Sequence, residues 1–387
     1  ISGNITKDTK LYKKEIYLLL GNVFITDNVT LSIEPGTLIL GDFNTKASLV
    51  ISNGAKIIAE GTLTDPIIFS SNRGIKKNGD WGGIFILGNS PTNRLEERSK
   101  LDYGLNPSSS EMILYGGTDK ESNSGILKYV RIEYAGKRTK NYGYFNGLTL
   151  AGVGSETILE NIMVSYCQGD SFSILGGNTI LSQLVSFRSK RSDFKFNYGA
   201  TAILSNSLAV RSPYSSNGGS SKCLYVKSYE KKEEFDFSKN RTWVRARNNT
   251  FLNSSEDLES DIKMNLVQEA VYIGEDALLD MNKSVISGFN PAVIFNEKIT
   301  VNQDNLEKIS FNAMLFNNCS GNIFVEYNSN NEDLENWYGN SAFFNVYAKS
   351  DNFETFIDTR STRRPDFRLR INKIIASNEV DPDLRMD

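Results

Sequence analysis

The sequence predicts an all-β protein, a single right-handed parallel β-helix with long loop excursions and minor helices in its last third. Three observations lead to this fold: short β-branched or alternating runs separated by Gly, Asn and Asp; a repeat of about 22–24 residues; and scarce helical periodicity over the first two-thirds. The 387 residues would suit two or three globular domains, but a solenoid grows by adding rungs and absorbs this length as one body.

The first strands are expected in short apolar runs that tight Gly-containing turns connect. They fall at residues 23–25, 29–33, 49–51, 67–69 and 84–87.

Two interleaved strand series follow at one shared period. Residues 148–150, 172–174 and 194–196 form the first series, and residues 162–164, 185–187 and 208–210 form the second. Stacked rungs produce two series of equal period and constant offset, because equivalent strands pair side by side and apolar side chains stack inside the coil.

The remaining segments divide the chain into a cap, a coil and its excursions. Residues 1–20 are predicted to cap the N-terminal end, and residues 21–387 to form one β-helix domain. Polar stretches at about 90–124 and 212–240 read as loops that leave the coil, the second with a flexible linker over residues 215–221. From about residue 241 to 387 we expect further rungs and a C-terminal cap, with short helices near residues 256–269 and 331–338.

Composition excludes several classes of enzyme. The chain has no His, so a Ser-His-Asp or Cys-His nucleophile, a His-ligated zinc and a His general base are all excluded. Cys167, Cys223 and Cys319 are far apart and odd in number, which argues against a zinc site or a disulfide framework. We expect buried free thiols, with one long-range disulfide as the open alternative.

Composition also limits partners and location. Lys and Arg total 43 against 46 Asp and Glu, so no strong net field favours binding to nucleic acid. No apolar run approaches the ~20 residues that a membrane-spanning helix needs. The chain opens at Ile1 without a targeting signal, and we expect a signal peptide or lipid anchor upstream of it.

Several short sequence motifs resemble those of a known group of proteins. They are Glu34-Pro35-Gly36-Thr37, Asp65-Pro66-Ile67-Ile68-Phe69, Gly79-Asp80-Trp81-Gly82-Gly83, Tyr129-Val130-Arg131-Ile132-Glu133-Tyr134-Ala135-Gly136 and Asn146-Gly147-Leu148-Thr149-Leu150. In the residues of these motifs and in their order along the chain, residues 15–210 resemble secreted or lipid-anchored β-helix proteins of Bacteroidota with a pectin-lyase-like fold. The resemblance implies an extracytoplasmic surface protein without assigned chemistry, of a kind labelled by analogy with adhesins or protease passenger domains.

A polysaccharide lyase is the enzyme alternative. The acidic clusters of the family are thinned here to Asp170 and Asp193, which lie about one period apart and would stack on adjacent rungs at about 4.8 Å. With Arg188 and Arg191 nearby, they would form a site for an acidic polysaccharide. Two carboxylates are few for Ca²⁺, the one cofactor this alternative would use, and Asp more commonly caps turns.

Glycan or protein binding is the favoured function. Tyr and Trp rings offer an apolar face to a sugar and a polar tip to its hydroxyl groups. Tyr142, Tyr144, Tyr198 and Tyr214 are the predicted ligand-binding residues, whereas Trp81 between its glycines is expected to stack on the coil. The sequence therefore predicts a monomeric, non-catalytic surface β-helix, with the lyase as runner-up and a protease-passenger-like domain as a further alternative.

Overall fold

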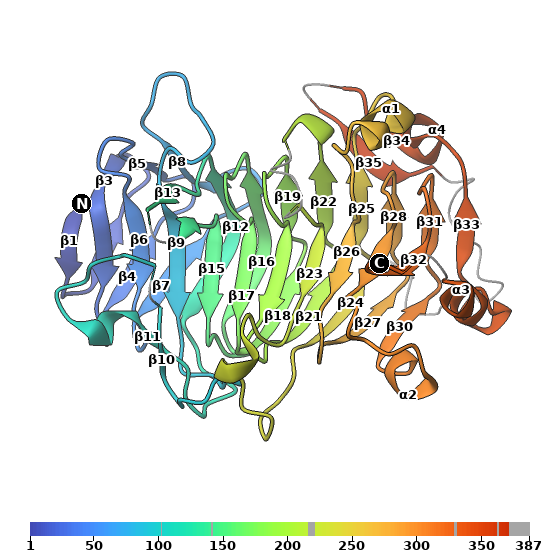
Figure 1. The fold of residues 1–387 in the computed structure, drawn as a ribbon. Coiled ribbons are helices and arrows are strands. Elements are labelled where there is room, and N and C mark those ends of the chain that lie inside the picture. The colour runs from blue at the N-terminus through green and yellow to red at the C-terminus, as the bar shows by residue number, and fades with distance from the viewer. Residues whose placement is uncertain (102, 141, 216–220, 329–330, 362–363, 371–387) are drawn as a thin grey trace, which may run out of the picture.

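The computed structural model describes residues 1–370 except 102, 141, 216–220, 329–330 and 362–363. Figure 1 shows an elongated stack of strands that runs from β1 at one end to β33 and helix α3 at the other. The strands of the stack pair in parallel along three ladders, and each turn of the chain adds one strand to each ladder. This is the predicted parallel β-helix.

The first ladder includes strands that place Phe172, Phe194, Phe196 and Phe295 in the core. Its members are β1 (Ser2–Ile5), the second part of β3 (Ile16–Ile25), β6 (Ser48–Ile51), β9 (Gly83–Leu87), β15 (Leu148–Ala151), β17 (Phe172–Leu175), β20 (Phe194–Asn197), β23 (Leu224–Val226), β26 (Val271–Ile273), β29 (Val293–Phe295) and β32 (Ile323–Val325).

The second ladder follows the first along each turn of the coil except the last, in which no second-ladder strand lies between β32 and β33. Its members are β2 (Thr9–Leu11), β4 (Thr30–Ile33), β7 (Lys56–Glu60), the first parts of β12 (Gly125–Glu133) and β16 (Ile158–Ser165), β18 (Asn178–Ser182), β21 (Thr201–Ser205), β24 (Trp243–Arg247), β27 (Leu278–Asn282) and β30 (Ile309–Asn312).

The third ladder closes each turn. Its members are the first part of β3, β5 (Leu38–Gly41), β8 (Ile67–Ser71), the second parts of β12 and β16, β19 (Val185–Phe187), β22 (Leu208–Arg211), β25 (Thr250–Asn253), β28 (Val285–Ser287), β31 (Leu315–Asn317) and β33 (Val346–Ala348).

Short elements decorate the coil outside these ladders. They are the antiparallel pairs β10 (Ser99–Lys100) with β11 (Leu114–Tyr115), β13 (Arg138–Thr139) with β14 (Gly143–Tyr144) and β34 (Phe356–Asp358) with β35 (Asp366–Leu369), the helices α1 (Leu258–Lys263), α2 (Gln303–Leu306), α3 (Glu332–Tyr338) and α4 (Asn352–Thr355), and the 3₁₀ turns η1 (Ser110–Ile113), η2 (Pro213–Ser215), η3 (Lys232–Glu234) and η4 (Ser341–Phe343).

Alternate residues of each strand point into one continuous core, because side chains of a strand alternate between its two faces. In the first ladder Leu148 pairs with Phe172, and Phe172 pairs with Phe194. The rings of Phe172 and Phe194 are nearly parallel, with centroids 5.3 Å apart. The register of this first strand series is therefore the predicted one.

The structure corrects the expected segment boundaries. The boundary at residue 20 falls inside β3, and residues 1–20 form a rung through β1, β2 and β3. The excursion expected at 212–240 is interrupted by the rung strand β23, so it is two separate loops. In the second series Val185 pairs with Met163 and not with Ile162, a shift of one residue.

The C-terminal third carries the helices that its sequence predicts, and one of them covers the end of the core. From α3, Leu334 and Tyr338 are buried with the main core cluster. The Tyr338 hydroxyl donates a hydrogen bond to the Ile309 carbonyl at 2.7 Å, which satisfies the one polar group of the ring. Most of the predicted 215–221 linker lies outside the described residues.

Two further expectations concern the thiols and the membrane. Cys167, Cys223 and Cys319 are buried free thiols, because their positions on different rungs face the interior. Burial raises the pKa of the Cys319 thiol to about 11, so it stays protonated near neutral pH. No helix in the described ranges is long and apolar enough to cross a bilayer.

Lys137 supplies a pH-dependent contribution to stability. Its side chain is buried, with its ammonium hydrogen-bonded to Asn22 Oδ1 at 3.2 Å and to the Lys46 carbonyl at 2.6 Å, and no carboxylate of the described residues pairs with it. Burial lowers the pKa of Lys137 to about 8, because the charged form is poorly solvated there.

We therefore expect the free energy of unfolding to rise between about pH 8 and the ordinary lysine pKa near 10.5, because the unfolded chain holds the proton that the folded chain has lost. The slope from this group approaches about 1.4 kcal/mol per pH unit. Urea titrations at stepwise pH measure it, with Lys137→Met as the comparison. Parallel pH profiles of the two proteins would contradict the assignment.

Candidate functional site

A groove of about 1040 Å³ lies beside the corner between the first and second ladders. Its floor is a column of outward side chains, one from each of four successive rungs. Asn178 pairs in register with Thr201, Thr201 with Trp243, and Trp243 with Leu278. Neighbouring strands lie about 4.8 Å apart, so the floor runs along the coil axis and spans roughly 14 Å.

Two loops from this corner form the walls. The first, residues 88–124, connects β9 to β12, and the second, residues 227–242, connects β23 to β24. Figure 1 shows both projecting from the lower edge of the coil. The loops contribute Ser90, Pro91, Thr92, Leu95, Glu97, Gly117, Thr118 and Lys120 from the first, and Lys239, Asn240 and Arg241 from the second.

The two walls are fastened to each other and to the coil, which preorganises the groove. Asn93 is the central residue: its backbone N–H donates to the Tyr198 carbonyl at 3.0 Å, its side-chain amide donates to the Ser228 carbonyl at 2.9 Å, and its carbonyl accepts from the Asp236 N–H at 2.9 Å. An isolated antiparallel bridge joins Arg94 to Phe235 beside it. A wall held in this way keeps its shape without a ligand.

The first loop is also anchored by its own apolar side chains. Leu101, Leu105 and Tyr115 are buried in a satellite cluster that covers the outer face of the first ladder at Val50 and Phe85. This explains why so polar a segment holds a fixed position, because the apolar residues spaced along it pack onto the coil.

Trp243 is the dominant feature of the floor, and the sequence reasoning missed it. Its side chain is 42% exposed, a large apolar surface for water to cover. The alternation of β24 forces it outward, because Val244 and Ala246 take the inward positions. The guanidinium of Arg245 lies 4.9 Å from the ring centroid. The alternating Trp-Val-Arg-Ala-Arg pattern was the signal that could have revealed it.

The charged groups of the groove are mostly cationic. Arg241 is paired with Asp276, with 3.3 Å between guanidinium and carboxylate, and the Lys239 ammonium is held by the Arg94 carbonyl. Lys120 is exposed and has no ion-pair partner among the described residues, and Glu97 is the single acid of the lining. The groove thus offers hydrogen-bond donors around an aromatic floor.

The two carboxylates of the lyase alternative do not stack. Phe172 pairs with Phe194, so Asp193 lies opposite Ser171 and Asp170 opposite Ser192. A one-residue offset turns the two side chains to opposite faces. The expectation of stacked carboxylates is therefore wrong.

Asp193 points into the coil. Its carboxylate is fully buried, accepts a hydrogen bond from Ser186 Oγ and forms an ion pair with Arg211 at 2.8 Å. Burial raises the pKa of Asp193, although the charge of Arg211 opposes this shift. This carboxylate belongs to the interior and has no access to a substrate.

Asp170 lies at the corner between the third and first ladders, where its Oδ1 accepts a hydrogen bond from the Ser192 N–H at 2.9 Å. Arg191 Nε is 3.9 Å from the same oxygen. Burial disfavours the charged form of Lys195 and so acts to lower its pKa. The carboxylates of Asp170 and Glu230 outweigh this effect and raise the pKa of the lysine. Arg188 is exposed and lies over the ring of Phe187, outside this cluster.

The predicted tyrosines come from three different loops. Tyr142 directly precedes β14 and Tyr144 lies in it, whereas Tyr214 is 77% exposed in η2. Both loops join the third ladder to the first. Tyr198 lies at the corner of the groove, half-buried, with the Arg94 guanidinium 4.9 Å from its ring centroid. Burial raises the pKa of Tyr198 to about 12. Trp81 is buried on the coil as expected, and its Nε1 donates to the Glu133 carbonyl.

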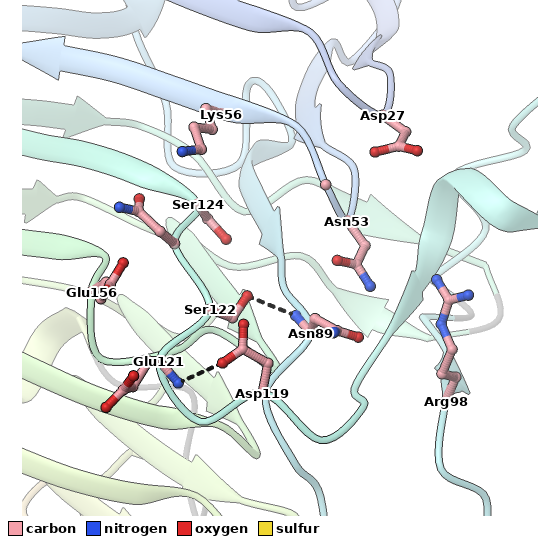
Figure 2. A pocket seen from close by; sticks show the side chains of 12 residues that line it. Asp27, Asn53, Lys56, Asn89, Arg98, Asp119, Glu121, Ser122, Ser124 and Glu156 are labelled. Carbon is pink, nitrogen blue, oxygen red and sulfur yellow. Dashed lines mark hydrogen bonds between the residues drawn. The ribbon is translucent and has the colours of Figure 1, made fainter.

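A second, smaller hollow lies on the other side of the first loop. Figure 2 shows its lining side chains, which are polar or charged on every side. Gly117, Thr118 and Lys120 border the groove, whereas Asp119 and residues 121–124 border this hollow, so the end of the loop separates the two. Within the described residues no group of three or more acidic or Cys side chains could hold a metal ion at either place.

Comparison with known proteins places the chain in a family. No curated protein and no solved structure matches it. A family model described as a pectate-lyase like beta helix domain matches residues 3–354, nearly the whole chain. The three parallel ladders agree with that description. The chain belongs to the pectate-lyase-like β-helix domain family.

Proposed function

We propose that the protein is a non-catalytic, surface-exposed β-helix that binds a glycan in the groove at Trp243. The in-register floor with its exposed indole carries the proposal. The apolar face of a pyranose packs against an aromatic ring, and the surrounding amides, hydroxyls and cations satisfy the sugar hydroxyls. The volume of the groove, about 1040 Å³, lies at the upper end of the range of ligand sites and accommodates an oligosaccharide.

The location of the protein is part of this proposal. We place it outside the cytoplasm, on the cell surface or secreted, because a groove open along the coil axis suits an extended polymer that does not enter the cell. The resemblance of residues 15–210 to exported β-helix proteins supports the same location. Detection of the intact protein on whole cells by surface labelling tests it.

Trp243→Ala is expected to weaken binding of any glycan that a printed array identifies by tenfold or more, equivalent to about 1.4 kcal/mol. Isothermal titration with the array hit measures the change. Tyr214→Ala is the matched control, because Tyr214 is equally an exposed aromatic residue but lies at another corner of the coil. Equal losses in the two variants, or no loss in Trp243→Ala, would contradict the groove as the binding site.

A lyase acting on acidic polysaccharide remains the second candidate, and one observation favours it. Asp170, Arg191 and Lys195 gather at one corner, where cations could neutralise a uronate carboxylate. Incubation with polyuronates, followed by absorbance of the unsaturated product, tests this activity. Product formation that Asp170→Asn and Arg191→Ala abolish would support it, and absence of product would leave glycan binding alone.

A further inference from the structure

The smaller hollow beside the first loop has a distinct charge pattern. It has a volume of about 630 Å³ and is ringed by the carboxylates of Asp27, Asp119, Glu121 and Glu156, with Lys56 and Arg98 as its two cations. Figure 2 shows that these side chains come from separate segments on all sides of the opening. We call this site the acidic hollow.

Most of its carboxylates are free to act on a ligand. The carboxylates of Asp27, Glu121 and Glu156 have neither a hydrogen-bond nor an ion-pair partner in the part of the chain that the structure describes. Among the described residues, the Asp119 carboxylate accepts only the backbone N–H of Glu121, at 3.0 Å. Because the carboxylates of the lining outnumber its two cations, the hollow has an excess of negative charge that would attract a cationic ligand.

Ser124 lines the acidic hollow as a nearly buried residue whose hydroxyl opens into it. Ser124 is 3% exposed, and its N–H donates to Thr157 Oγ1 at 2.9 Å. Its hydroxyl has no hydrogen bond to any described residue, and Figure 2 shows it directed toward the middle of the ring of side chains. A nearly buried polar group left in this way is satisfied by whatever fills the hollow.

The rim around this hydroxyl is fixed before a ligand arrives. The Asn89 N–H donates to Ser122 Oγ at 3.1 Å, and the Ser155 N–H donates to the Lys120 carbonyl at 3.0 Å. These bonds tie the returning end of the first loop to β9 on one side and to the next corner on the other. A ligand therefore meets carboxylates whose backbone supports are already in place.

A metal ion does not explain the pattern. Ca²⁺ takes six to eight oxygens at one point, whereas the described residues contain no group of three or more acidic side chains that could hold a metal. Dispersed carboxylates among amides and hydroxyls instead suit an extended ligand with several cationic groups and many hydroxyls. A free amino sugar combines both in every unit.

We propose that the acidic hollow binds an oligosaccharide carrying free amino groups, of the glucosamine type. The carboxylates of Glu121, Glu156 and Asp27 pair with its ammonium groups, and Ser124 accepts or donates a hydrogen bond to a hydroxyl. Charge-assisted bonds to ammonium make deacetylated units preferred over acetylated ones. The site is separate from the floor at Trp243, and its occupancy does not depend on that groove.

Calorimetry with a glucosamine tetramer and an N-acetylglucosamine tetramer tests the inference at a pH where the amines are protonated. We expect at least tenfold tighter binding of the glucosamine tetramer, weakened as salt is raised because the pairs are exposed. The double variant Glu121→Gln/Glu156→Gln should lose fivefold or more of this affinity. Glu60→Gln, an exposed acid on β7 outside the hollow, is the matched control and should lose none.

Three results would overturn the proposal. They are equal affinity for the two tetramers, an unchanged affinity in the double variant, and binding of a lysine-rich peptide but not of the glucosamine tetramer, which would identify a protein ligand. Trp243→Ala should leave this binding intact, so a failure of the acidic hollow and a failure of the groove are distinguishable. Lys56→Gln should tighten binding, because it removes one of the two cations of the lining.

Discussion

Arg211→Ala is expected to lower the free energy of unfolding by about 3–5 kcal/mol, because it leaves a buried carboxylate without its counter-ion. Asp193 is fully buried, and Arg211 Nη1 lies 2.8 Å from its Oδ2. The same guanidinium donates to the carbonyls of Arg191 at 2.7 Å and Ser189 at 3.3 Å. The substitution therefore removes the charge partner and also the hydrogen-bond donor of these carbonyls. Chemical denaturation of the two proteins measures the difference.

The double variant Asp193→Leu/Arg211→Met separates the pair from its surroundings. Replacement of both charges by apolar groups removes the unpaired ion, so we expect this variant to be more stable than Arg211→Ala. A loss below about 1 kcal/mol in Arg211→Ala would contradict a dry interior at this position. Loss of the same size in the single and double variants would show that the backbone contacts, and not the charge pair, supply the stability.

Phe194→Ala is expected to cost about 3–5 kcal/mol, the range found for large-to-small changes of buried aromatic residues. The ring is fully buried between Phe172, at 5.3 Å between centroids, and Phe251, at 6.1 Å. Ladder hydrogen bonds hold the strands on both sides, so the space cannot collapse and a cavity remains. Thermal and chemical unfolding measure the loss.

Phe237→Ala provides the comparison for Phe194, because this ring lies largely exposed on the second wall of the groove. We expect a change within about 0.5 kcal/mol for it. A small effect of Phe194→Ala would mean that neighbouring rungs shift to fill the space. In that case the core would repack around the substitution, and no cavity would remain.

The coil could be predicted from sequence because its core repeats. Leu148, Phe172 and Phe194 recur at one spacing, and the structure pairs them in that register. The second strand series was located, but Met163 and not Ile162 pairs with Val185. Spacing alone locates a strand to within a residue, whereas hydrogen-bond register depends on the length of every corner before it.

This one-residue uncertainty explains why the predicted stacking of Asp170 on Asp193 is wrong. Asp170 and Asp193 are separated by about one period, yet an offset of one residue sends Asp193 inward to Arg211 and leaves Asp170 at the corner. Side chains of a strand alternate with period two, so the smallest error in register reverses the face. The spacing of the two aspartates in the sequence does not reveal that the Asp193 carboxylate is buried.

The groove escaped prediction for a different reason. Its walls, residues 88–124 and 227–242, are far apart in sequence and meet because both leave the coil at the same corner. The strand β23 was hidden inside a polar stretch, so the loop that follows it had no assigned corner. Trp243 could therefore not be placed opposite the first loop.

The floor of the groove gives the protein a simple route to new specificity. Each rung contributes one outward residue to it, while the inward neighbours Ala202, Val244 and Leu279 keep the fold. Thr201 or Leu278 can thus be exchanged without disturbing the interior. The proposed recognition surface and the core thus occupy opposite faces of the same strands, so substitutions in one rung at a time would change the first without disturbing the second.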